Sequence, residues 1–308
     1  MTRGVQLQAL RDFPLPFVRE VQRSSNGAVR ARVAGCRWHF QHGPIDLIIG
    51  ADGDRAAVDN AVEHTWSRFQ GLLAELVREL PMLRSPVQEA VAVAGPVARR
   101  MVEACWPHRG RFITPMAAVA GAVADELIGR FRADQRIVRA YVNNGGDIAL
   151  HVAAGQRYKV GLYADIGGLK RREVHALDGD FEVAGEMPVR GVATSGWRGR
   201  SFSLGIADSV TVLARTAAGA DAAATMIANS VNVQDPAILR RPACQLKDDT
   251  DLGDRVVTVA VGALAADRVR EALDAGRARA CELAEQGLIH GAALWLQGVV
   301  ECVGCVSD

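Results

Sequence analysis

Segments of strand length and segments of helical periodicity follow one another along this chain in an irregular order. Repeating βαβ units would predict a parallel sheet, but they do not occur, and no internal repeat or low-complexity linker divides the chain. A length of 308 residues is compatible with one large domain or with two. The irregular order therefore favours a single α+β domain.

The clearest helix is predicted between Asp54 and Pro81. Apolar residues recur there at spacings of three and four, so they share one helical face, and Asp54 is available as an N-cap. Two more helices are predicted at Pro96–Cys105 and Pro115–Phe131. Alanine and glycine fill much of the second one, which permits close packing either within the chain or between copies in a homo-oligomer.

Strand patterns surround these helices. Residues 30–40 and 46–50 predict a hairpin, because a Gly-Pro turn signal separates them. Ile137–Val142, Ile148–Val152 and Tyr158–Tyr163 are expected at the centre of the sheet. The remaining expected elements are strands at Val189–Ala193, Ser209–Ala214 and Val256–Val261, helices at Ala217–Asn229 and Ala266–Gln286, a surface loop or flap at Arg240–Gly253, and a last strand or strand pair at Leu288–Val300.

Composition excludes several classes of protein. Apolar residues make up 49% of the chain and charged residues 23%, so the chain folds and is not intrinsically disordered. A net charge of +1 lacks the basic excess that a nucleic-acid partner requires. No apolar segment approaches the roughly 20 residues of a membrane span, and residues 1–20 lack the apolar core of a secretory signal. We therefore expect a cytoplasmic protein whose six cysteines are reduced thiols.

Three polar segments are candidates for chemistry, and the first follows the Ile137–Val142 strand. It consists of Asn144, Gly145, Gly146 and Asp147. Adjacent glycines allow a ligand to approach the backbone, and Asp147 presents a carboxylate at the start of the next strand. The alternative is an ordinary tight turn that Asp147 caps.

The second segment is the predicted loop Thr194–Ser203. Its hydroxyls, guanidinium groups and exposed N–H groups could hold phosphate, or the loop could simply be polar and solvated. Trp197 could stack on a ligand ring or anchor the loop against the core. The candidate binding residues of this loop are Thr194, Ser195, Gly196, Arg198 and Ser201.

The third segment lies on the predicted helix after the Ser209–Ala214 strand. Asp221 and Thr225 are four residues apart, so they lie on one face, and only small residues separate them. A carboxylate and a hydroxyl together suit Mg²⁺, which prefers oxygen ligands. An aspartate near a helix N-terminus is also favourable with the helix dipole alone, so this reading stays open.

Four segments in order resemble the ApbE superfamily, the Mg²⁺-dependent flavin transferases: YVNNGGDIAL at 141–150, GVATSGWRGR at 191–200, SVTVLA at 209–214 and ADAAAT at 220–225. The resemblance implies one ApbE-like domain over residues 1–308, with a mixed sheet and flanking helices. It further implies that a cleft binds FAD, that Mg²⁺ lies at its pyrophosphate, and that FMN is transferred to a threonine of an acceptor protein. By the same resemblance, Asp221 and Thr225 are the metal ligands and catalytic residues, Asn144–Asp147 is the flavin-side turn, and Thr194–Gly196 lines the cleft.

One segment departs from the family pattern. The transferases carry His-x-x-Asp-Pro-x-Thr-Gly after the Thr-Ser-Gly loop, whereas residues 201–208 here read SFSLGIAD. The chain thus resembles a distinct branch of the superfamily, and two functions are expected as alternatives. One is an enzyme that binds a flavin or nucleotide diphosphate with Mg²⁺ and acts as an FMN transferase or an FAD hydrolase of the pyrophosphatase type. The other is a non-flavin accessory protein in sulfur assimilation toward homocysteine, which that branch is thought to accompany.

Cys302 and Cys305 form a Cys-x-x-Cys at the end of the sequence. The pair could bind zinc with Cys281 and His290, could carry sulfur or redox chemistry in the accessory function, or could be unremarkable reduced thiols. His151, in the strand after the Gly-Gly-Asp turn, is the acid–base candidate if the protein is an enzyme, and otherwise a histidine of the core.

Overall fold

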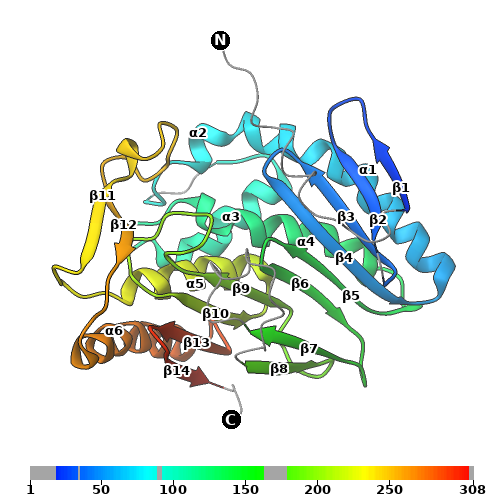
Figure 1. Cartoon of the computed structure of the whole chain (residues 1–308). Helices are drawn as coiled ribbons and strands as arrows, with labels where there is room; N and C mark the ends of the chain where they lie inside the picture. Colours follow the sequence, from blue (N-terminus) through cyan, green and yellow to red (C-terminus); the bar gives the residue numbers. More distant parts are fainter. Residues whose placement is uncertain (1–18, 34, 89–91, 163–178, 305–308) are drawn as a thin grey trace.

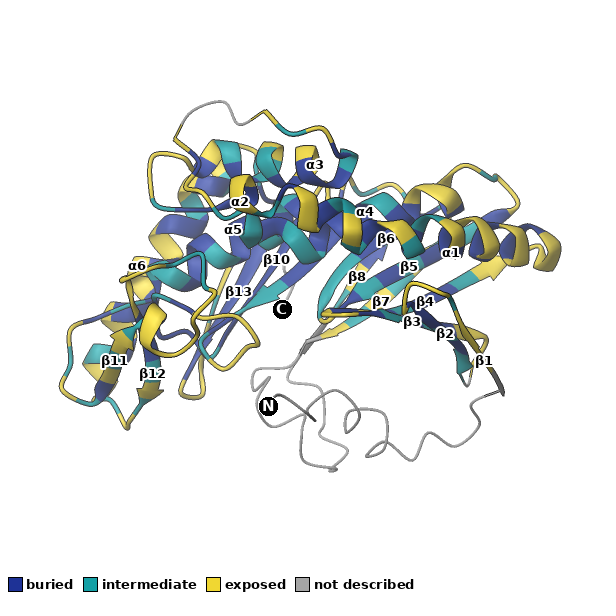
Figure 2. Cartoon of the chain, turned by 90° about the horizontal axis from the view of Figure 1, so that it is seen from above, coloured by how far each residue is buried: buried dark blue, intermediate teal, exposed yellow. Residues whose placement is uncertain are grey.

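The computed structural model describes residues 19–33, 35–88, 92–162 and 179–304. Ten strands form one sheet in the order β1-β2-β3-β4-β5-β6-β9-β10-β13-β14 (Figure 1), and all neighbouring strands in it are antiparallel. The prediction that β5 and β6 lie at the centre is confirmed, but the third strand expected there, Tyr158–Tyr163, is wrong: β7 pairs with β8 in a separate two-stranded sheet. Helices α1, α3, α4 and α5 cover one face of the sheet (Figure 2). The expected α+β class with flanking helices is thereby confirmed, whereas the sheet, which was expected to be mixed, is antiparallel throughout the described residues.

The strands of the large sheet are β1 (Arg19–Arg23), β2 (Val29–Val33), β3 (Arg37–His42), β4 (Ile45–Gly53), β5 (Ile137–Asn144), β6 (Asp147–Val152), β9 (Gly191–Ser195), β10 (Ser209–Ala214), β13 (Gly291–Leu296) and β14 (Val299–Gly304). Two hairpins form separate two-stranded sheets: β7 (Arg157–Leu162) with β8 (Gly179–Ala184), and β11 (Ile238–Pro242) with β12 (Val256–Val261).

The α-helices are α1 (Arg55–Arg78), α2 (Leu80–Leu83), α3 (Pro96–Cys105), α4 (Val119–Arg132), α5 (Ala217–Ser230) and α6 (Ala266–Glu285). Short 3₁₀ helices are η1 (Trp106–His108), η2 (Pro115–Ala118) and η4 (Ala243–Gln245). Helix α1 begins as predicted, because the Asp54 carboxylate accepts a hydrogen bond of 2.9 Å from the N–H of Ala57.

Several predicted elements differ in detail. Residues 30–40 form two strands instead of one, because Gly35 and Cys36 turn the chain with φ of 76° and 53°. The predicted flap at Arg240–Gly253 begins inside β11, which pairs with β12. The predicted helix Pro115–Phe131 opens as the 3₁₀ helix η2 before α4. The end of the chain forms a strand pair, with a turn at Gln297 and Gly298.

The core divides into regions of different composition. Under α1, the rings of Phe40, Trp66 and Phe69 contact one another, with centroids 5.1–5.9 Å apart. Around α5, alanine replaces these rings: nine of the helix's residues are buried, and six of those are alanines preceding Met226. Small side chains let the backbones of α4 and α5 approach closely. A Cβ on Gly121 of α4 would lie 2.3 Å from the carbonyl oxygen of Ala217.

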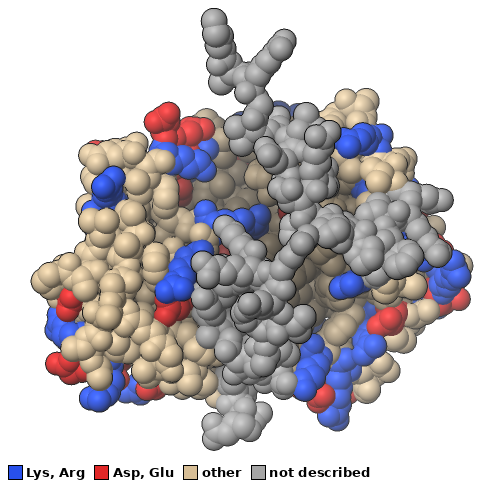
Figure 3. Space-filling model, in the orientation of Figure 1, with Lys and Arg blue, Asp and Glu red and all other residues tan. Residues whose placement is uncertain are grey.

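Charged side chains of both signs are interspersed on the face shown in Figure 3, and no continuous basic surface forms there among the described residues. Within the described ranges, no helix has the length and apolar character needed to cross a membrane.

Candidate functional site

The β5–β6 turn places Asp147 beside the second predicted segment. Gly145 and Gly146 adopt φ of 68° and 116°, a region that suits glycine, and the N–H of Gly146 donates to Oδ1 of Asn143 at 2.8 Å. Asp147 then opens β6, and its Oδ1 accepts a hydrogen bond of 3.2 Å from the N–H of Thr194. The turn and the start of the Thr194–Ser203 loop are therefore in direct contact.

Asp221 projects from the first turns of α5 toward the N-terminus of α4. Its Oδ2 accepts a hydrogen bond of 3.1 Å from the N–H of Gly121. In return, Asp125 of α4 accepts hydrogen bonds of 3.1 and 2.9 Å from the N–H groups of Ala217 and Ala218, at the start of α5. Each helix thus supplies a carboxylate that caps the other, which satisfies N–H groups that have no partner within their own helix.

The turn and the helix crossing are joined by Asn144. Its side-chain amide donates a hydrogen bond of 3.1 Å to the carbonyl oxygen of Ala120. Asn144 is buried, so this contact fixes the turn against the first residues of α4. The predicted first and third segments, with Asp147 and Asp221, consequently meet at one place.

Simultaneous ionisation of the Asp147 and Asp221 carboxyl groups is unfavourable. Burial raises the pKa of Asp147 to about 7, although the N–H of Thr194 and the charge of Arg200 act against the rise. Burial also raises the pKa of Asp221 well above its ordinary value, and the charge of Asp147 raises it further. Protonation of one carboxyl group, or binding of a cation, therefore removes the cost of burying two negative charges close together.

Thr225 completes an oxygen-rich group of side chains. It lies one helical turn after Asp221, is partly exposed, and makes no hydrogen bond through its hydroxyl within the described ranges. Two carboxylates and a free hydroxyl are the kind of donors that Mg²⁺ prefers. The residues present therefore fit a magnesium ion, and Asp147 joins the pair that the sequence indicates.

The side chain of Asp208 stabilises the Thr194–Ser203 loop through several contacts. Oδ1 of Asp208 accepts a hydrogen bond of 3.2 Å from the indole of Trp197 and lies 3.3 Å from Nε of Arg198. Its Oδ2 accepts a hydrogen bond from the N–H of Gln297 at 2.6 Å. Trp197 accordingly anchors the loop, which was one of its two expected roles, and a Cβ on Gly196 would lie only 2.4 Å from the backbone oxygen of Asp208.

Arg200 lies closer to the turn than the predicted Arg198 does. A Cβ on Gly145 would come within 1.8 Å of Nη2 of Arg200, so this guanidinium lies directly over the Gly-Gly turn. Ser201 is exposed. The hydroxyl of Thr194 pairs with that of Thr211 on β10 at 2.9 Å. The sequence indicated Arg200 only as one of the two guanidinium groups of this loop, and it missed Asp125, for which the signal available was a carboxylate in an alanine-rich helix.

His151 and the cysteines lie apart from this group. Nε2 of His151 is 2.9 Å from the carbonyl oxygen of Ile137, and burial lowers the pKa of the imidazole. Cys302 lies in β14, opposite Ala293, while Cys305 lies outside the described residues. Among the residues that the structure describes, no group of three or more His, Cys, Asp or Glu could hold a metal ion.

Fold and site together define an α+β protein with paired carboxylates at the crossing of two helix N-termini. A family model described as AbpE bacteria matches residues 29–302, and the chain belongs to this family. The resemblance to the ApbE-like superfamily is thereby confirmed.

Curated relatives carry the name UPF0280 protein. The relative from Methanothermobacter thermautotrophicus is 36% identical over 192 residues, covering 62% of this chain and 70% of that protein. The relative from Methanospirillum hungatei is 31% identical over 209 residues, covering 67% of this chain and 79% of that protein. The relative from Methanopyrus kandleri is 41% identical over 156 residues, but the match spans only 56% of its length and 50% of this chain.

Solved ApbE structures match most of this chain, with low sequence identity and TM-scores below 0.5. The ApbE protein of Thermotoga maritima is 13% identical with a TM-score of 0.40, covering 86% of this chain and 96% of that one. The flavinyl transferase ApbE of Pseudomonas stutzeri is 11% identical with a TM-score of 0.42, covering 93% and 95%.

Proposed function

We propose that this protein binds a flavin or nucleotide diphosphate together with Mg²⁺ where α4 crosses α5, and that it cleaves or transfers the bound molecule. The observation that carries the proposal is the pairing of Asp147 with Asp221, whose pKa values are raised because burial and the neighbouring charge oppose ionisation. Such a pair is suited to a divalent cation.

Asp147, Asp221 and the hydroxyl of Thr225 would hold the cation. When bound, Mg²⁺ supplies positive charge that offsets the charge of a diphosphate. The chain's own residues bind the rest of the ligand. Arg200, an exposed guanidinium over the Gly-Gly turn, can donate two parallel hydrogen bonds to phosphate oxygens.

The Gly-Gly turn and the loop after it form the proposed binding surface. Among the described residues, no atom lies within 4 Å of where a Cβ on Gly146 would be, so this part of the chain leaves the space beside the backbone open to a ligand. The other residues that the sequence indicates as ligand contacts are also part of this proposal, and Asn144 holds the turn against α4. They are Asn144, Gly145, Thr194, Ser195, Gly196, Arg198 and Ser201.

The reaction takes one of two forms in this proposal. With FAD, transfer would break the pyrophosphate bond, join the FMN phosphate to a threonine hydroxyl of an acceptor protein and release AMP, whereas hydrolysis would use water as the acceptor and release FMN and AMP. His151, the acid–base candidate that the sequence indicates, shares a face of β6 with Asp147 but lies four residues further along the strand, so in this proposal it acts only on a part of the ligand that extends along β6. The proposal places the protein in the cytoplasm, where flavin nucleotides are available.

Thermal unfolding with FAD, FMN, ATP and ADP, with and without Mg²⁺, tests this function. A ligand at 100 times its Kd adds about 2.7 kcal/mol to the free energy of unfolding, so a diphosphate with Mg²⁺ should raise Tm by several degrees. FMN, which has a single phosphate, should have a smaller effect. Asp221→Ala should abolish the Mg²⁺-dependent part, whereas Asp267→Ala, at an exposed helix start, should retain it. An unchanged Mg²⁺-dependent shift in Asp221→Ala would contradict the proposal.

A further inference from the structure

Helix α5 is buried except along one row of polar side chains. Asp221, Thr225 and Asn229 are partly exposed and follow each other at intervals of four residues. The only other partly exposed positions of the helix are Gly219 and Ser230. Because residues four apart are neighbours on a helix surface, these side chains form a continuous track along α5.

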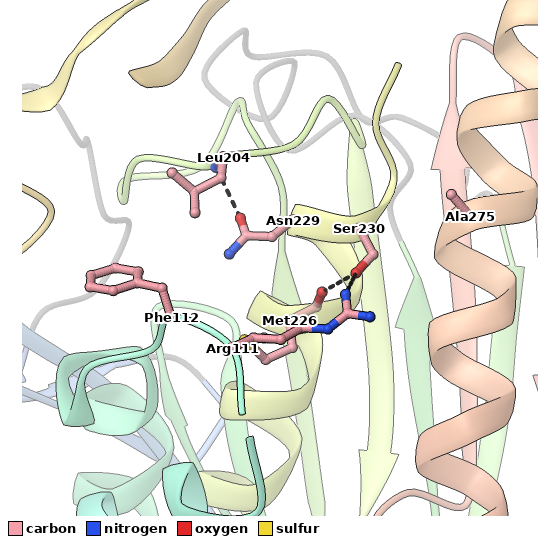
Figure 4. A pocket seen from close by; sticks show the side chains of 7 residues that line it. All are labelled: Arg111, Phe112, Leu204, Met226, Asn229, Ser230 and Ala275. Carbon is pink, nitrogen blue, oxygen red and sulfur yellow. Dashed lines mark hydrogen bonds between the residues drawn. The ribbon is translucent and has the colours of Figure 1, made fainter. Parts of the chain in front are cut away.

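The track ends at a cavity of about 330 Å³ (Figure 4), a size that suits a small-molecule site. Its lining combines apolar side chains with one aromatic ring and a few polar groups. The lining residues are Arg111, Phe112, Leu204, Met226, Asn229, Ser230 and Ala275. The cavity thus lies beside the C-terminal end of α5, whereas Asp221 lies near its start.

Asn229 presents only hydrogen-bond donors to this cavity. Its Oδ1 accepts hydrogen bonds from the N–H of Leu204 at 2.9 Å and from the hydroxyl of Ser203 at 3.3 Å. Its Nδ2 has no partner within the described ranges and points into the space between Leu204 and Phe112 (Figure 4). Because the oxygen is engaged by the backbone, the amide orientation is fixed with both N–H groups available.

The other polar groups agree with this polarity. Arg111 is exposed at the edge of the cavity, and its Nη1 donates to the hydroxyl of Ser230 at 3.4 Å. That hydroxyl in turn donates to the carbonyl oxygen of Met226 at 2.9 Å. Phe112 is held in place by the guanidinium of Arg255, whose Cζ lies 3.3 Å from the ring centroid and which does not line the cavity.

We infer that this cavity receives the planar ring of the ligand whose diphosphate lies at Asp221 and Thr225, and that the ring presents carbonyl or ring-nitrogen acceptors to Asn229. The inference rests on the proposed function. Eight residues of helix separate Asp221 from Asn229, a rise of about 12 Å, which a sugar or ribityl chain between a diphosphate and a ring can span. The aromatic and aliphatic side chains of the cavity would contact the faces of the ring, and the amide N–H groups of Asn229 would donate hydrogen bonds to acceptors on its edge.

Calorimetric titration with Mg²⁺ and a series of probes tests the inference. The probes are inorganic pyrophosphate, which has no ring, and ADP, GDP and FAD, which have one. A ring-bearing probe should bind at least about tenfold more tightly than pyrophosphate, and GDP or FAD, with ring carbonyls, more tightly than ADP. Equal affinity of pyrophosphate and every ring-bearing probe would overturn the inference while leaving the diphosphate site intact.

Two variants locate the effect. Asn229→Asp keeps an oxygen for the N–H of Leu204 but replaces the donors by an acceptor, so it should weaken the preferred ring-bearing probe about tenfold or more and leave pyrophosphate within twofold. Phe112→Leu should also weaken only ring-bearing probes. Asn60→Asp, on the exposed face of α1, is the control for added charge.

The two hypotheses fail in different ways. Equal weakening of pyrophosphate and the ring-bearing probes, or no weakening at all, in Asn229→Asp would overturn the ring site. Loss of Mg²⁺-dependent pyrophosphate binding in the unmodified protein would instead overturn the proposed function, and the ring site with it.

Discussion

The region under α1 and the region around α5 differ in the size of the side chains that fill them. Under α1, large rings such as Phe40 and Phe69 fill the space between helix and sheet and are completely buried. Around α5, alanine and glycine bring backbones together, so short polar side chains reach the neighbouring helix. The first arrangement stabilises by apolar area, whereas the second positions Asp125 and Asp221 on the backbone of the opposite helix.

This difference in packing predicts that substitutions under α1 affect mainly stability, whereas substitutions around α5 affect mainly ligand binding. Aromatic contacts far from Asp221 should affect unfolding without changing ligand binding. Changes at the α4–α5 crossing should alter binding even where their effect on stability is small. The following predictions test this separation, in order of expected size.

Replacing a buried ring in the aromatic region should have the largest effect on stability. Phe69→Ala removes a completely buried side chain that contacts Phe40 and Trp66, so the free energy of unfolding should fall by about 3–5 kcal/mol. Urea unfolding measures the change. Below the transition, the Mg²⁺-dependent affinity for the diphosphate ligand should stay within about twofold of that of the unmodified protein, and a larger loss would contradict the separation.

The buried side chain of His108, near α6, should make the free energy of unfolding depend on pH. Burial, aided by the charge of Arg279, lowers the pKa of His108 from 6.5 to about 4, so the folded protein holds a neutral imidazole. The unfolded chain binds the additional proton between these pH values. The contribution of His108 is therefore fully present above pH 6.5 and is lost as the pH falls toward 4, by about 3 kcal/mol in total.

Comparison with His108→Gln isolates this contribution. The difference in unfolding free energy between the two proteins should narrow or reverse between pH 6.5 and 4, because glutamine takes up no proton. Parallel pH profiles would show that His108 is not held neutral in the folded state.

Adding one methyl group at the helix crossing should disturb the site. A Cβ at position 121 would lie 2.3 Å from backbone atoms of Ala217, so Gly121→Ala should force α4 and α5 apart, cost about 1–3 kcal/mol and abolish Mg²⁺-dependent binding. Gly129→Ala is the matched control on the same helix. A Cβ there meets no atom of the described residues within 4 Å, and alanine should stabilise the helix by about 0.5–1 kcal/mol. Retained binding in Gly121→Ala would contradict the importance of close helix packing.

Neutralising Asp147 should change the free energy of unfolding in the favourable direction. Because the pKa of Asp147 is raised to about 7, the stability associated with its neutral form is lost as the pH rises through 7. At pH 8 without metal, Asp147→Asn should therefore raise the free energy of unfolding, and the gain should disappear near pH 4. The same variant should lose Mg²⁺-dependent binding. A lower free energy of unfolding for Asp147→Asn than for the unmodified protein at pH 8 would show that the charge of Asp147 is not unfavourable in the folded state.

Local patterns in the sequence predict much of the fold. The bounds of Pro96–Cys105, Ser209–Ala214 and Val256–Val261 are confirmed without change, because helical spacing and short apolar runs are properties of adjacent residues. The division of residues 30–40 into two strands was missed, since it depends on left-handed backbone at Gly35 and Cys36. The single domain over residues 1–308 stays a prediction for the ranges outside the described residues.

The site is less predictable because its contacts are made between distant segments. Asn144, Asp147, Thr194 and Asp221 were indicated by motif order, and hydrogen bonds now connect them to the same helix crossing or to each other. Asp125 and Asn229 have no local signature of their roles, and the position of Arg200 over the Gly-Gly turn has none either. Their roles come from how α4, α5 and the loop after β9 pack together.

Isothermal titration of FAD or ADP into the unmodified protein and into Asp221→Asn, each in Mg²⁺ and in a chelator, tests the central proposal most directly. The asparagine keeps an oxygen for the N–H of Gly121, so the helix crossing is retained while the charge is removed. The unmodified protein should bind at least about tenfold more tightly in Mg²⁺, and Asp221→Asn in Mg²⁺ should match the unmodified protein in chelator. Equal Mg²⁺ dependence in the two proteins would show that Asp221 does not hold the cation.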